Sequence, residues 1–124
     1  MLAVIEAKQL IESASFTEIN DVYTVNLPEE VVSNTDKTIV LITEAKPELT
    51  TQGNNDFYGI KRLCEIQLFY KLDVDFNIED FEIRLMKLFT KNHWSVIDIR
   101  ERTFDPDTQQ ITGVFYVSQD KILN

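Results

Sequence analysis

Apolar residues recur along the chain at two spacings, one typical of helices and one typical of strands. Near the N-terminus they fall on every third or fourth position, which predicts an amphipathic helix that ends near Ser15. A second stripe follows Asn77, a good helix N-cap, and predicts a helix that runs to about Lys91. The apolar positions of the two stripes are Val4, Ala7, Ile11 and Ala14, and then Ile78, Phe81, Leu85, Leu88 and Phe89.

Strand-like segments occupy much of the remaining sequence. Residues 63–70 alternate most regularly and predict one apolar face. Residues 22–27 also alternate until Pro28 interrupts them, which places that strand near a sheet edge, whereas residues 38–43 are dense in β-branched side chains and predict a more buried strand. The apolar face of the most regular strand carries Cys64, Ile66, Leu68 and Tyr70.

The C-terminal third predicts a β-hairpin. Residues 94–103 and 111–117 both suit strands, and the segment between them has the composition of a tight turn. Proline presets one backbone angle there, and the neighbouring polar side chains can hydrogen-bond local amides. We therefore expect an architectural turn formed by Asp105, Pro106, Asp107 and Thr108.

A concentration of turn-forming residues between Glu44 and Ile60 predicts a long loop. Two aromatic residues, Phe57 and Tyr58, stand among its polar residues, where burial within their own subunit is less assured. Two roles stay open for them, because they could fix the loop to its own domain or contact a partner.

These elements follow the order α-β-β-β-α-β-β and predict an α+β fold. Two helices can cover only one face of a sheet of about five strands, and the short connections favour mainly antiparallel pairing. The chain has only three glycines and three prolines, with no repeat and no low-complexity linker. We therefore expect residues 1–124 to form a single domain.

The charge of the chain restricts its partners. The chain has twenty-one acidic and twelve basic residues, which give a net charge of −9. A negatively charged protein repels the phosphate backbone of nucleic acids, so we expect no sequence-specific nucleic-acid binding. The imbalance is concentrated in residues 1–60, whose net charge is −7. Apolar runs are short and the N-terminus lacks a secretion signal, which predicts a soluble protein without membrane association, synthesised in a cytoplasm.

No group of residues predicts catalysis, a metal site or a cofactor site. The single histidine, His93, follows the second helix, where a capping role explains it, and Cys64 suits the core of a strand. Asp73 to Asn77 begins like a calcium loop, but Ile78 stands where that loop needs glycine and Arg84 where it needs a bidentate glutamate. Phosphate-binding and dinucleotide-binding motifs are absent from the sequence.

Several motifs in a fixed order resemble a tail-component family of long-tailed bacteriophages, the siphophages. The resemblance covers almost the whole chain, including the first helix. The motifs are Leu27-Pro28-Glu29, Gly53-Asn54-Asn55-Asp56-Phe57-Tyr58-Gly59, Ile66-Gln67-Leu68-Phe69-Tyr70-Lys71, Trp94 and Asp105-Pro106-Asp107-Thr108-Gln109-Gln110.

This resemblance implies a tail terminator, also called a tail completion or head-tail joining protein. Such proteins form a six-membered ring that caps the finished tail tube at the head-proximal end of the virion tail. The implied partners are other copies of the chain, the major tail tube protein and a head-tail connector protein, with DNA at most passing through. The candidate interface with a neighbouring subunit or the tail tube is Asn54, Asn55, Asp56, Phe57 and Tyr58.

A second function is compatible with the composition. A small acidic α/β domain can neutralise a basic partner by charge complementarity, as inhibitor and immunity proteins do. An inhibitor would form a tight complex with one basic partner, whereas a terminator would form rings or bind tail tubes.

Overall fold

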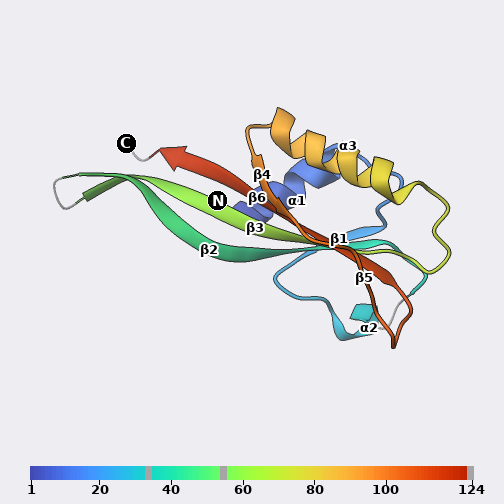
Figure 1. Ribbon diagram of the computed structural model, residues 1–124. Helices are drawn as coiled ribbons and strands as arrows, with labels where there is room; N and C mark the ends of the chain where they lie inside the picture. The colour runs from blue at the N-terminus through green and yellow to red at the C-terminus, as the bar shows by residue number, and fades with distance from the viewer. Residues whose placement is uncertain (33–34, 54–55, 123–124) are drawn as a thin grey trace.

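The computed structural model describes residues 1–32, 35–53 and 56–122. Within these residues the chain forms two long helices, one short helix and a six-stranded sheet (Figure 1). The elements are α1 (Ala3–Ser13), β1 (Asp21–Thr24), α2 (Glu29–Val32), β2 (Ile39–Gly53), β3 (Asp56–Phe69), α3 (Ile78–Lys91), β4 (Ser95–Ile99), β5 (Thr103–Phe104) and β6 (Ile111–Ile122).

The strand order is β1-β2-β3-β6-β4, with the short β5 paired to β6 beside β4. Only the β1–β2 pair is parallel, and the other pairs are antiparallel. The α+β class is therefore confirmed, and β1 lies at the sheet edge as its proline boundary indicated. The additions to the predicted order are the short helix α2 and the two-residue strand β5.

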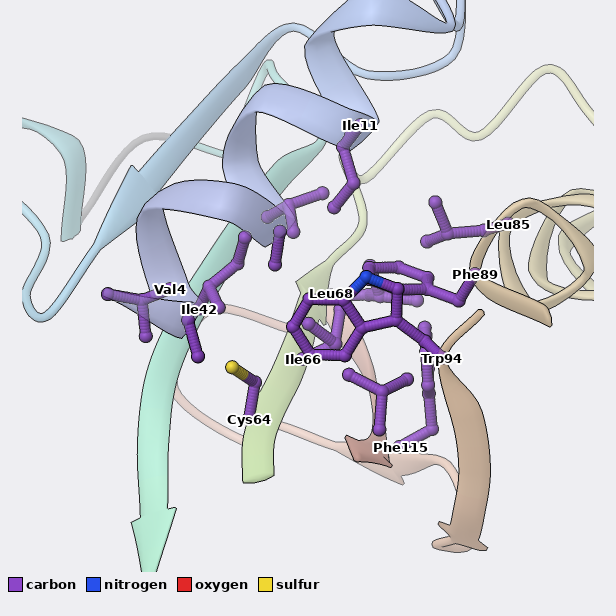
Figure 2. Close-up of a cluster of buried hydrophobic side chains, with 14 of the residues drawn as sticks. Val4, Ile11, Ile42, Cys64, Ile66, Leu68, Leu85, Phe89, Trp94 and Phe115 are labelled. Atoms are coloured by element: carbon purple, nitrogen blue, oxygen red, sulfur yellow. The ribbon is translucent and has the colours of Figure 1, made fainter. Parts of the chain in front are cut away.

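Both long helices pack on one face of the sheet, and their apolar stripes form the core with it (Figures 1 and 2). Alternate residues of β3 and β6 point toward the helices, which is why every second position is buried over residues 64–68 and 113–117. In β2 the four residues from Ile39 to Ile42 are all buried. Phe89 of α3 makes edge-to-face contacts with Trp94 and Phe115 at centroid distances of 5.7 and 6.1 Å. The side chains in Figure 2 are fully or almost fully buried, so each contributes roughly 1.5–3 kcal/mol through the hydrophobic effect.

The ends of α3 are fixed by local hydrogen bonds. The Asn77 side chain accepts a 3.0 Å bond from the Asp80 amide, which confirms the N-cap. At the other end the Trp94 amide donates to the Phe89 carbonyl, and His93 adopts a left-handed backbone with φ of 69°. His93 thus occupies the position where the chain reverses out of the helix, and its side chain is exposed.

The prediction of a long loop between Glu44 and Ile60 was wrong, because β2 and β3 continue through this segment as one long hairpin. Its turn formers are tolerated for two reasons. Pro47 falls within a register shift between Ala45 and Glu48, on a strand edge where a missing amide proton costs little. The remaining turn formers gather where β2 ends and β3 begins, at the paired residues Gly53 and Asp56.

A turn joins β5 to β6 at the place expected for it. The Asp105 carboxylate accepts bonds from the amides of Asp107 (2.9 Å) and Thr108 (3.4 Å), and these bonds lower the pKa of Asp105. The Gln109 amide donates to the Asp105 carbonyl at 2.7 Å, and Gln109 adopts a positive φ of 64°. Pro106 takes a turn position that needs no amide donor.

Candidate assembly interface

The outer end of the β2–β3 hairpin projects beyond the rest of the sheet and beyond both long helices (Figure 1). β1 flanks β2 only as far as Ile42, and β6 flanks β3 only as far as Gly59. Past these points, residues 51–53 and residues 56–58 form a two-stranded ribbon, which we call the arm. The arm has neither a third strand nor a helix packed on it among the described elements.

The structure describes only part of the candidate interface. Asp56, Phe57 and Tyr58 belong to β3, and the backbone registers Gly53 with Asp56 and Gln52 with Phe57. Asn54 and Asn55 lie outside the described residues, as do the side chains of residues 56–58. The sequence therefore assigned this segment the wrong secondary structure, and its role as an interface stays a prediction.

The base of the arm is anchored to α1 by Arg62. Its guanidinium donates to the Met1 carbonyl at 3.0 Å, to the Gln119 side-chain oxygen at 2.6 Å and to the Glu6 carboxylate. These bonds tie the start of α1 to β3 and β6 at the point where the arm leaves the sheet. Beside them lies a mainly apolar pocket of about 280 Å³, lined in part by Leu2, Ile60 and Leu63.

A buried polar cluster joins α3 to the sheet. Glu82 accepts a 2.5 Å hydrogen bond from the Tyr70 hydroxyl, and Arg102 donates to both Glu82 oxygens at 2.9 and 3.2 Å. Burial and the hydrogen bond to Glu82 raise the pKa of Tyr70. A methyl group on Gly113 would come within 2.9 Å of a Glu82 oxygen, so this close approach requires glycine.

The sheet face opposite the two long helices is covered only at one end. There, Val31 and Val32 of α2 line a cavity of about 120 Å³ with Ile39 and Phe69. Elsewhere on this face Tyr116 donates a 2.7 Å bond to Glu65, which raises the pKa of Tyr116, and Arg100 stacks 5.4 Å from its ring. This face and the arm are the largest parts of the described sheet without a helix against them.

Two observations bear on metal binding and thiol chemistry in the described residues. No three His, Cys, Asp or Glu residues among them are grouped to hold a metal ion. Cys64 is fully buried, and burial raises the pKa of its thiol to about 11, which disfavours the reactive thiolate. Of the helices in the described part of the chain, none is long and apolar enough to cross a membrane.

The geometry defines an α+β domain with a projecting hairpin arm. The chain belongs to the family named "protein of unknown function (DUF806)", whose pattern matches residues 2–122. A search of curated proteins found no match. The family match spans the helices, the sheet and the arm together.

Proposed function

We propose that the protein is a structural virion-assembly protein that caps the tail tube of a siphophage and helps to join the tail to the head, acting as a ring. It works without catalysis, and its place is the head-proximal end of the tail. The motifs that resemble tail terminators support this proposal, and so does the α+β fold. The single observation that carries it is the arm.

An isolated two-stranded ribbon is marginally stable in water, and its outer edges present unpaired backbone groups. β2 pairs with β3 along one of its edges. Along its other edge, residues 43–53 have no strand partner among the described residues. A subunit that keeps such an arm gains stability when a second copy or the tail tube covers it. In a ring, the arm of each copy would contact the next copy at a different surface, which is the heterologous contact that closed rings use.

The action on the tail would be steric. A ring that occupies the tube end blocks the position where another tail-tube subunit would add, and its free side contacts the head-tail connector. DNA would pass through the ring without sequence-specific contacts. The net charge of −9 is useful in this role if it lines the opening, because an acidic wall repels phosphates. A ring structure with a neutral or basic opening would refute this part of the proposal.

The test replaces the arm aromatics, Phe57→Ser with Tyr58→Ser, in phage that assemble tails. We expect nearly normal thermal melting of the purified protein and overlong or uncapped tails by negative-stain imaging, because each buried aromatic anchor is worth about 2 kcal/mol at an interface. Phe104→Ser is the matched control, since Phe104 is an exposed aromatic on β5, away from the arm. Normal tail length with the double variant would contradict the proposal.

The alternative function, inhibition of a basic partner, gives a different result in solution. Light scattering with and without tail-tube protein measures the mass of the complexes. A terminator should form closed rings or bind tubes, whereas an inhibitor should stay small and bind one basic protein tightly. Failure to bind tubes, combined with a compact one-to-one complex, would favour the inhibitor.

A further inference from the structure

A basic groove crosses the outer side of the helical layer in this acidic protein. It has a volume of about 270 Å³ and lies between the end of α1 and the C-terminal half of α3. Its apolar floor is formed by Phe16 and Leu88, and its walls carry only positive charges. The charged residues are Arg84, Lys87 and Lys91.

Two of these cations have no carboxylate partner in the part of the chain that the structure describes. Arg84 pairs with Glu18 and lies 5.7 Å from the Phe16 ring centroid, and the pairing lowers the pKa of Glu18. Within the described residues, neither Lys87 nor Lys91 forms an ion pair. Like charges four positions apart on a helix repel each other, so this pair destabilises α3 on its own. The helix dipole favours Lys91, in the last turn, but not Lys87.

The opposite charge is concentrated just before α3. Asp73 and Asp75 are exposed in the connection from β3, and Glu79 and Asp80 follow in the first turn of the helix. Asp75 forms a 3.2 Å ion pair with Lys71, but its side chain is 76% exposed, so its carboxylate remains open to a second partner. The segment as a whole carries more negative charge than this one lysine neutralises.

An apolar side chain accompanies these carboxylates. Leu72, next to Asp73, is 50% exposed. Its amide donates to the Thr35 carbonyl at 2.9 Å, so the segment is held to the body of the domain. The acidic segment therefore presents charge and apolar area together on a fixed backbone.

This acidic segment cannot neutralise the basic groove of its own chain. Along α3, Asp80 is the acidic residue nearest to Lys87, and the seven positions between them span about 10.5 Å along a helix. That distance exceeds the screening length of about 8 Å at physiological salt. Arg84, which is closer to Asp80, is paired with Glu18 instead. The acidic segment and the basic groove therefore lie at different places on one subunit and carry opposite charges. Each of them also presents apolar area.

We propose that copies of this chain associate head to tail, with residues 72–75 and the first turn of α3 of one copy docked in the basic groove of the next. Leu72 lies on the floor formed by Phe16 and Leu88, and the carboxylates face Lys87 and Lys91. The contact joins two different surfaces, as a closed ring requires. This inference rests on the proposed ring and names a second contact between its subunits, in addition to that of the arm.

The test uses two charge-reversed variants of the full chain. The groove variant is Lys87→Glu with Lys91→Glu, and the segment variant is Asp73→Lys with Asp75→Lys. Sedimentation velocity over a concentration series at low salt should show that the wild type self-associates. Added salt should weaken this self-association, because salt screens the charges. Each variant alone should associate at least about tenfold more weakly, because like charges then face each other.

An equimolar mixture of the two variants should recover association. Each groove then meets a segment of opposite charge on the other variant, and the two alternate around an even-numbered ring. Lys8→Glu with Lys121→Glu is the matched control, since it gives the same net charge as the groove variant while leaving the groove unchanged. Circular dichroism and thermal melting show that each variant is folded.

Three results would overturn the inference: a wild type that stays monomeric throughout the series, a groove variant that associates like its control, or a mixture that recovers nothing. Tail capping is scored separately by imaging. If the groove and segment variants cap tails normally, the proposed function holds and this contact is wrong. If the wild type associates as described but never affects tail length, the contact holds and the proposed function fails.

Discussion

The buried cluster of Glu82, Tyr70 and Arg102 gives the sharpest stability prediction. Glu82 faces the sheet from α3 and accepts every hydrogen bond that holds the cluster together. Glu82→Ala removes that acceptor and leaves the two donors in different environments. Tyr70 is completely buried, whereas the Arg102 side chain is 42% exposed.

The cost follows from this difference. A buried hydroxyl left without a partner costs about 1–3 kcal/mol. The exposed part of Arg102 can return to water, so losing its pairing adds only about 0–1 kcal/mol. We therefore expect Glu82→Ala to lower the free energy of unfolding by about 1–4 kcal/mol, which at its upper end is a large part of the stability of an ordinary domain.

Urea denaturation measures this change through the transition midpoint at constant m-value. Tyr70→Phe, which removes the hydroxyl and keeps the carboxylate paired with Arg102, should cost only about 1 kcal/mol. The double variant should cost less than the sum of the single variants, because it contains no unsatisfied hydroxyl. A loss below about 0.5 kcal/mol for Glu82→Ala, or strict additivity in the double variant, would refute the reasoning.

Two further predictions concern the core. Leu85→Ala, at a fully buried position of α3, should lower the unfolding free energy by roughly 2–5 kcal/mol, and an unchanged melting temperature would contradict the packing of this helix. Cys64, whose pKa is raised to about 11 by burial, should react with iodoacetamide at pH 8 only after denaturation, so rapid modification of the folded protein, followed by mass spectrometry, would show that β3 opens readily.

The sequence alone determined the elements whose signals are local. The stripe of α3 and its Asn77 cap, the alternation of residues 63–70 and the turn at Asp105 each depend on residues a few positions apart, so their patterns are visible in the chain. The α+β class followed from the order of these elements. The interface role predicted for residues 50–59 stays a prediction.

Tertiary structure decided what depends on partners distant in the sequence. Residues 44–60 contain turn formers, yet they form strands because β2 and β3 pair along their length and the Pro47 region falls at a register shift. Local sequence cannot show that a proline will lie where its missing donor is harmless. The parallel pairing of β1 with β2 depends in the same way on the path of the chain.

The polar sites depend on three-dimensional neighbours even more strongly. Glu82 lies four positions after Ile78 and three before Leu85, so the sequence shows that it falls in the apolar stripe of α3. The two groups that make its burial tolerable, the Tyr70 hydroxyl and the Arg102 guanidinium, come from other parts of the chain. The basic groove exists only because Phe16 of the α1–β1 connection packs beside Leu88 of α3. Local patterns therefore determined which elements form, while long-range packing determined which charges and hydroxyls meet, because an interaction energy depends on distance in space and not on separation along the chain.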